Sequence, residues 1–288
     1  MTKRNFGIEI EAISPVEGWV VACKLDQAGI DSCCEGYGHV TRSYWKITTD
    51  RSIQSTTENP FTMEIVSPIL KSEIDVTSTE KSGFEHIKDV CKVLEKNDVK
   101  VNRTCGLHVH VDAHDFTIED FKNLFRIWRR YQDAVYAMVA PSRKGNDYTL
   151  PIPEDRLTEM ENLTSIQNLE SYVGGSYRLS AMNNPLQRRY GLNVKSFWAY
   201  RTIEFRLHQG TVNADKIIAW VKFCIAMVSR AKNGSRLPKE TRVVENNKNP
   251  KKLLYCLTMY NKDKLMYDLL DRKTQTFLVK RAREFAKV

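Results

Sequence analysis

The sequence lacks several features that would assign it to a familiar class of protein. Its seven cysteines include no Cys-x-x-Cys pair, which argues against both a disulfide framework and a structural zinc site. No uncharged apolar run approaches the roughly 20 residues of a membrane span, and the basic residues near the N-terminus precede no apolar segment. We therefore expect free thiols, a cytoplasmic location and no membrane partner.

The usual nucleotide-binding and hydrolase motifs are missing as well. The chain has no Walker P-loop, no Gly-x-Ser-x-Gly nucleophile motif and no dinucleotide fingerprint, and it contains no internal repeat or low-complexity tract. If this chain binds a nucleotide, metals and side chains must hold the phosphates in place of a glycine-rich loop.

The composition is that of an ordinary globular protein with an uneven distribution of charge. The 288 residues are 42% hydrophobic and 27% charged, with a net charge of +9. Residues 230–288 hold 16 Lys and Arg against six Asp and Glu, so the rest of the chain is nearly neutral. This basic segment is either a surface for nucleic acid or another anionic partner, or the solvated faces of helices.

Three short stretches repeat a pattern of polar, apolar and polar residues. They are Glu9-Ile10-Glu11, His108-Val109-His110 and Glu204-Phe205-Arg206. Residues two apart in a strand point to the same face of the sheet, so each stretch places two ionisable side chains together. We expect one face of a sheet to carry a layer of acids, imidazoles and a guanidinium.

Four carboxylates in strand-like settings suggest a metal site: Glu9, Glu11, Glu64 and Glu204. Carboxylates that share one face repel unless cations lie between them, and hard divalent ions prefer oxygen ligands. Magnesium is the ion that usually accompanies a nucleotide. Any one of these residues taken alone is more simply explained as structural.

The two histidines and the arginine have structural and functional interpretations. His108 and His110 are too few for a zinc site, which needs three or four ligands, and His114 is expected beyond the strand. Arg206 either forms an ion pair with Glu204 or binds a phosphoryl group in transfer. Asp50 is either a base at the edge of a site or the cap of a turn.

Strand and helix patterns interleave in a way that predicts an α+β fold. Expected strands cover 5–13, 40–49, 62–66, 106–112, 190–196 and 201–208, and expected helices cover 16–28, 83–96, a long segment after Thr117, and 214–231. Residues 141–153 resemble an exposed loop able to close over a site. We expect a mostly antiparallel, curved sheet with helices on one face and an open active-site face. Residues 1–232 would form the catalytic domain, and 233–288 a basic helical extension with helix caps at Asn249 and Thr274.

Taken in order, these motifs resemble the amidoligase family of carboxylate-amine ligases, which share the glutamine synthetase catalytic fold. The similar segments are Phe6–Glu11, Asp50–Ser52, Met63–Pro68, Cys105–Asp112 and Thr202–Leu207 followed by Gly210-Thr211. The resemblance spans about residues 5 to 228, and residues 230–288 carry no matching motif.

The resemblance implies a role for each matching residue. Glu9, Glu11, Glu64, His108 and Glu204 would bind two or three Mg²⁺ ions. His110 would contact the nucleotide, Arg206 would stabilise the γ-phosphoryl group, and Arg189 lies where relatives bind phosphate or substrate. The family's acidic loop usually reads Asp-Gly-Ser, whereas Arg51 follows Asp50 here, so the role of Asp50 toward the amine is left open.

The implied reaction uses ATP to join a carboxylate to an amine through an acyl phosphate. The substrates of relatives range from small metabolites to peptides and other macromolecules. Two alternatives remain: a phosphotransferase of related fold, and a nucleic-acid binding protein that uses the basic residues 230–288.

Overall fold

The computed structural model describes residues 3–38, 40–73, 79–173, 188–234 and 269–285, and it divides into two compact units. The N-terminal unit comprises Lys3–His110 and His208–Val221. The C-terminal unit comprises Met1–Thr2, Val111–Leu207 and Lys222–Val288. The catalytic domain expected over residues 1–232 and the basic extension expected over 233–288 stay predictions.

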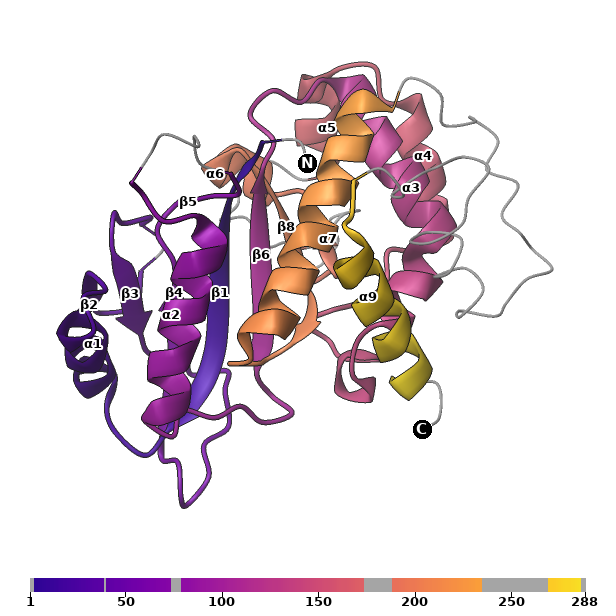
Figure 1. The fold of residues 1–288 in the computed structure, drawn as a ribbon. Coiled ribbons are helices and arrows are strands. Elements are labelled where there is room, and N and C mark those ends of the chain that lie inside the picture. The colour runs from indigo at the N-terminus through magenta and orange to yellow at the C-terminus, as the bar shows by residue number, and fades with distance from the viewer. Residues whose placement is uncertain (1–2, 39, 74–78, 174–187, 235–268, 286–288) are drawn as a thin grey trace. The chain divides into compact units, whose positions relative to one another are not determined.

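The N-terminal unit is built on a sheet whose hydrogen-bonded strand order is β2-β3-β4-β1-β6, with the short β5 also pairing with β1 (Figure 1). The strands are β1 (Asn5–Ser14), β2 (Ser32–Cys34), β3 (Trp45–Thr48), β4 (Phe61–Val66), β5 (Leu70–Lys71) and β6 (Gly106–Asp112). β1 pairs antiparallel with β4 and β5, and β3 with β4, whereas β2 and β3 are parallel. The expected mostly antiparallel character is confirmed.

Alternation along β1 explains why one face of this sheet is covered. Ile8, Ile10 and Ala12 are fully buried, while Glu9 and Glu11 point to the opposite face. Two helices, α1 (Gly18–Gln27) and α2 (Gly83–Lys96), pack on the apolar face. Phe84 of α2 stacks on Phe6 of β1, with 5.5 Å between ring centroids.

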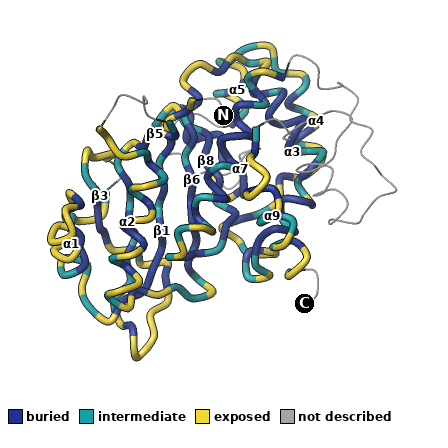
Figure 2. The backbone as a smooth tube through the Cα atoms, in the orientation of Figure 1, coloured by how far each residue is buried: buried dark blue, intermediate teal, exposed yellow. Residues whose placement is uncertain are grey.

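A glycine at the start of each helix allows this close packing. A β-carbon at Gly83 would lie 2.7 Å from the Leu70 side chain, and one at Gly18 would lie 2.9 Å from Ile47. Both neighbours belong to the apolar face, so both helices cover it. Figure 2 shows the resulting burial along β1 and β6. The opposite face carries the acids and the histidines.

The C-terminal unit is mainly helical. Its elements are α3 (Ile118–Ala137), η1 (Pro141–Arg143), α4 (Glu154–Glu159), η2 (Met160–Asn162), α5 (Ile166–Tyr172), β7 (Leu192–Asn193), α6 (Ser196–Tyr200), β8 (Thr202–Gln209), α7 (Ala214–Asn233) and α9 (Arg272–Phe285). The last residues of β8 and the first eight of α7 belong to the N-terminal unit. α3 begins with the expected Thr117 cap, paired reciprocally with Asp120. β7 pairs antiparallel with β8, and Trp128 of α3 packs on Phe205 of β8.

Several expected elements have different bounds. α1 begins at Gly18, because the Ser14 hydroxyl accepts the Val16 N–H in a turn before the helix. The expected strand over 40–49 is confined to β3, because side chains hold the segment before it: the carboxylate of Glu35 binds Arg42 and Tyr44.

The expected strand over 190–196 is also shorter than predicted and is confined to β7. α6 begins at Ser196, whose hydroxyl donates to the carbonyl oxygens of Asn193 and Thr202. In α9 the cap is Asp271 rather than Thr274, since the Asp271 carboxylate accepts the Thr274 N–H at 2.8 Å. Asn249, the other expected cap, lies outside the described residues.

The segment 141–153 is not the fully exposed loop that we expected. The Arg143 side chain is buried and donates to the carbonyl oxygens of Arg206 and Leu207, the first at 3.0 Å. The Thr149 hydroxyl is buried and donates to the carbonyl of Arg143. These contacts anchor the segment at Arg143 and Thr149, so part of the expected loop is packed against the protein.

Two expectations from composition can be checked on the described residues. The six cysteines described, Cys23, Cys33, Cys34, Cys91, Cys105 and Cys224, are all free thiols. Among the helices that the structure describes, none has the length and apolar character to cross a membrane.

Candidate active site

The acidic residues of the N-terminal unit occupy one face of its sheet, as the alternation predicted. Cross-strand register places Glu11 of β1 opposite Glu64 of β4, and Glu64 opposite Thr48 of β3. Side chains that are directly opposite share a face. We call this surface of Glu9, Glu11, Lys46, Thr48, Asp50, Glu64, His108 and His110 the acidic face.

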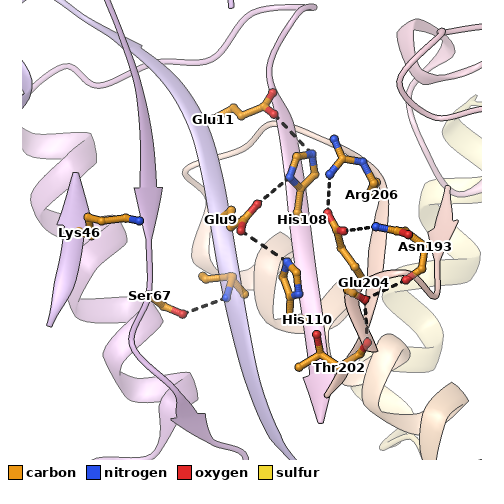
Figure 3. A network of polar contacts seen from close by, with 12 residues as sticks. Glu9, Glu11, Lys46, Ser67, His108, His110, Asn193, Thr202, Glu204 and Arg206 are labelled. Atoms are coloured by element: carbon orange, nitrogen blue, oxygen red, sulfur yellow. Dashed lines mark hydrogen bonds and ion pairs between the residues drawn. The ribbon is translucent and has the colours of Figure 1, made fainter. Parts of the chain in front are cut away.

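Histidines from β6 contact the glutamates of β1 (Figure 3). His108 Nδ1 lies 2.9 Å from Glu9 Oε2, and His108 Nε2 lies 3.4 Å from Glu11 Oε1. His110 Nε2 lies 3.4 Å from Glu9 Oε1. The Gly106 N–H donates to Glu11 Oε2 at 2.5 Å. The two strands thus fix both carboxylates and both imidazoles in a largely buried layer.

Two groups of possible metal ligands share one residue. Glu9, Glu64 and His108 each offer a ligand atom, and these atoms lie within 4.8 Å of one another. Glu11, Asp50 and Glu64 meet the same condition. The second group offers only carboxylate oxygens, the donors that Mg²⁺ prefers. Glu64 lies in both groups, so the same carboxylate would contribute a ligand to an ion bound at either one.

The electrostatics of Glu64 are unfavourable without a cation. Burial, followed by the negative charges of Glu9, Glu11 and Asp50, raises the pKa of Glu64 well above its ordinary value. The nearby positive charge of Lys46 offsets only part of this effect. A cation between these carboxylates would reverse the unfavourable interaction and favour the ionised form.

The pKa of Glu9 shifts in the opposite direction to that of Glu64, because two histidines interact with its carboxylate. Burial by itself raises the pKa of Glu9, but hydrogen bonds with His108 and His110 outweigh burial. The pKa of Glu9 is therefore held well below its ordinary value. The two glutamates are neighbours on one surface, yet only Glu9 is stabilised as an anion by the protein itself.

Asp50 is both a turn residue and a member of the acidic face. Its Oδ1 accepts the Ser52 N–H at 2.7 Å, which is the turn-capping contact that the sequence suggested. Its carboxylate also lies with those of Glu11 and Glu64. The structure therefore groups Asp50 with possible metal ligands, a role not expected from the sequence.

Sequence reasoning also missed Lys46 and Thr48. Both are buried and lie two residues apart on β3, in register with β4, so they face the same side as Glu64. The Thr48 hydroxyl has no hydrogen-bond partner among the described residues. The signal was present: Lys46-Ile47-Thr48 repeats the polar, apolar and polar pattern of the other strands.

The C-terminal unit holds a second set of predicted residues around Glu204 (Figure 3). Glu204 is 1% exposed. Its Oε1 accepts a short hydrogen bond from Arg206, and its Oε2 accepts one from the Asn193 amide at 2.6 Å. The ion pair that we considered for Arg206 is therefore present. Asn193 was not predicted as a site residue, although it directly follows Gly191-Leu192.

Arg189 is also in the C-terminal unit, on the protein surface. Its guanidinium lies over the ring of Tyr148, 5.2 Å from the centroid, and its carbonyl accepts the Leu150 N–H. Its binding of phosphate stays a prediction. A metal site that Glu204 shares with the glutamates of the N-terminal unit also stays a prediction.

No curated protein matches the sequence. Among solved structures, a bifunctional glutathione synthetase from Pasteurella multocida matches with 11% sequence identity and a TM-score of 0.43. The match covers 99% of this chain and 47% of that chain.

A family model described as "putative amidoligase enzyme" matches residues 2–228. This range contains every segment that carries the resemblance. The chain belongs to the amidoligase family.

Proposed function

We propose that this protein is an ATP- and Mg²⁺-dependent ligase that joins a carboxylate to an amine through an acyl phosphate. Membership in the amidoligase family supports a ligase. The nucleotide, the metal, the intermediate and a glutamine synthetase-like catalytic fold are our proposal.

One observation carries the proposal: Glu64 is shared by two groups of possible metal ligands. A half-buried carboxylate that faces three others is costly when ionised, and its raised pKa expresses that cost. Paired cations explain why the chain keeps such an arrangement. Paired cations are also a recurring device for holding the phosphates of a nucleotide in transfer.

We assign the metal ligands first. Glu9, Glu64 and His108 would hold one ion, and Glu11, Asp50 and Glu64 another. Bound there, the ions would neutralise charge on phosphate oxygens. We further propose that Glu204 joins this site as a ligand, which requires both units to contribute to one catalytic centre.

The remaining residues would act on the nucleotide and the substrates. His110 would contact the nucleotide and Arg189 the phosphates or the substrate. Arg206 would donate from its planar guanidinium to the equatorial oxygens of the γ-phosphoryl group as it moves. Asp50 has an alternative role to that of a metal ligand: if its turn opens to the amine, its carboxylate would instead accept a proton from the attacking nitrogen.

The reaction balances in two steps. A carboxylate oxygen of the acid attacks the γ-phosphorus of ATP, and the bond to the β-phosphate oxygen breaks to release ADP. The amine nitrogen then attacks the carbonyl carbon of the acyl phosphate, loses a proton, and expels phosphate to leave an amide. Water must be kept out, because it would hydrolyse the acyl phosphate.

Calorimetric titration tests the proposal without knowledge of the substrates. We expect Mg-ATP to bind the wild type, and binding to be lost when magnesium is omitted or in Glu204→Ala. The wild type failing to bind Mg-ATP would contradict the proposal. Dependence of phosphate release on an added amine then separates a ligase from a phosphotransferase, which would release phosphorylated product without an amine.

We also propose that the basic segment 230–288 recruits an anionic macromolecule to the ligase. Within α9, the exposed cations are Arg272, Lys273, Lys280 and Arg283, against a single exposed acid past the cap, Glu284. Binding of a nucleic acid through this segment should weaken steeply with salt. The test is a binding assay with single- and double-stranded oligonucleotides at low salt. If neither binds, this part of the proposal is wrong.

A further inference from the structure

Lys46 is a buried cation on the acidic face to which neither the sequence nor the family assigns a role. It is 4% exposed. Register aligns Lys46 of β3 with Val66 of β4, and Val66 with Glu9 of β1. Lys46 and Glu9 thus stand in one row across the sheet, beside the row of Thr48, Glu64 and Glu11. The positive charge of Lys46 acts on Glu64, whose raised pKa it offsets in part.

The partners of Lys46 are not the carboxylates. Its Nζ donates to the carbonyl oxygens of Gly38 at 2.7 Å and Val40 at 3.4 Å. Among the described residues no carboxylate forms an ion pair with it. An ammonium has three donors, and two neutral carbonyls neither use the third nor cancel its charge. Burying such a charge costs free energy unless a partner compensates it.

A lysine that served only to neutralise the glutamates would have different contacts from those of Lys46. If Lys46 only relieved repulsion among the glutamates, its ammonium would sit against one of them in a direct ion pair. Instead the segment before β3 holds it at a fixed place near the carboxylates. Thr48, two residues on, adds a buried hydroxyl on the same face without a partner among the described residues. Both groups can donate to an oxyanion.

We infer that Lys46 binds the terminal phosphoryl group of the nucleotide, with Thr48 donating to the same group. This inference rests on the proposed function, since it places the γ-phosphate beside the proposed cations. A lysine ammonium is a compact point donor and suits a phosphate whose other oxygens face metal ions. The fixed ammonium would help hold the γ-phosphorus in position for attack by the acid.

The test compares ATP with ADP in Lys46→Met, which keeps the apolar stem and removes the charge. We expect Mg-ATP affinity to fall by roughly 10- to 100-fold, the loss of one charge-assisted hydrogen bond, and Mg-ADP affinity to stay unchanged. Lys46→Arg should recover part of the loss. The matched control is Lys71→Met on β5, whose exposed ammonium pairs with Glu80 and should leave both affinities unchanged.

Two further measurements separate binding from a structural role. Tyr44→Phe removes one of the two side-chain contacts that the segment makes with Glu35, without touching Lys46. If it reproduces the loss of ATP affinity, the effect comes from the segment and the inference is wrong. Calorimetry with Mg²⁺ alone should show unchanged or tighter binding in Lys46→Met, since a competing positive charge is removed.

Failure of this inference is distinguishable from failure of the proposed function. If the wild type does not bind Mg-ATP, the proposed function itself is contradicted. If the wild type binds but Lys46→Met binds ATP equally well, or loses ATP and ADP equally, only the role of Lys46 is overturned. Melting temperatures of all variants show whether each one is folded.

Discussion

The carboxylates of the two units are stabilised in different ways. In the C-terminal unit, Glu204 has a donor for each oxygen, from Asn193 and Arg206. In the N-terminal unit, Glu64 faces the negative charges of Glu9, Glu11 and Asp50, and the positive charge of Lys46 offsets them only in part.

This contrast distinguishes a preorganised carboxylate from one whose ionised form is favourable only with a bound cation. A fully paired carboxylate is held in one geometry and costs little when ionised. A carboxylate crowded by others is favourable only when something positive arrives. We therefore expect mutations of Asn193 and Arg206, the donors to Glu204, to act mainly on geometry and turnover, and mutation of Glu64 to act mainly on metal binding.

The largest expected effect is on turnover in Arg206→Ala. If the guanidinium stabilises charge that develops during phosphoryl transfer, its removal should lower kcat by roughly 100- to 1000-fold, as for loss of one preorganised donor. Mg-ATP affinity should change much less. The measurement is ADP release under saturating Mg-ATP. Arg206→Lys is the control, since it keeps the charge without the planar fork. Equal turnover in Arg206→Ala would remove Arg206 from the mechanism.

The next effect is on metal affinity in Glu64→Gln. Replacing the shared carboxylate should weaken Mg²⁺ binding by roughly 100-fold, because both proposed ions lose a charged ligand. The metal-free variant should melt at a higher temperature than the wild type, because a repelled charge is gone. Calorimetry and thermal melting measure both. A metal-free variant that is less stable than the wild type would show that Glu64 is already compensated.

The pH dependence of stability gives a third test of the comparison. The pKa of Glu64 is raised in the folded protein, so stability of the metal-free form should fall as pH rises above the unfolded value of about 4.3. The slope is at most about 1.4 kcal/mol per pH unit for one group, up to the folded pKa. Saturating Mg²⁺ should abolish this fall, and Glu64→Gln should lack it.

Glu9 should affect the free energy of unfolding at lower pH than Glu64 does, and in the opposite direction. Its folded pKa is depressed, so its stabilisation is present above about pH 4.3 and is lost as pH falls toward the folded value. Denaturant titrations from pH 3 to 8 on the wild type, Glu64→Gln and Glu9→Gln separate the two contributions. If both variants change the pH dependence of stability over the same pH range, Glu9 and Glu64 do not have separate effects.

The faces of the strands were predictable because alternation is local. The pattern in β1, β6 and β8 correctly paired Glu9 with Glu11, His108 with His110, and Glu204 with Arg206 on their respective faces. α2 was predicted with its observed bounds, since it has a capping box and a regular apolar stripe. In each case neighbours within four residues carry the signal.

The contacts that define the candidate site were harder to predict because they join distant segments. Asp50 joins Glu11 and Glu64 only through the folding of the sheet, and Lys46 depends on carbonyls of the preceding segment. Arg143 appeared to belong to an exposed loop, whereas its guanidinium is buried against carbonyls of β8. A loop composition rich in Pro, Gly and Asn says nothing about such anchoring.

The smallest expected effect concerns Asn193, and it tests whether Glu204 is preorganised. Asn193→Ala leaves Glu204 Oε2 without its 2.6 Å donor in a buried place, which should lower the free energy of unfolding by about 1–2 kcal/mol. A double-mutant cycle with Glu204→Gln isolates the pairwise contribution from unrelated changes in packing. If the two residues interact as the geometry indicates, their coupling energy should exceed about 0.5 kcal/mol. Coupling near zero would mean that Arg206 alone holds the carboxylate, so that the two regions differ less than their contacts suggest.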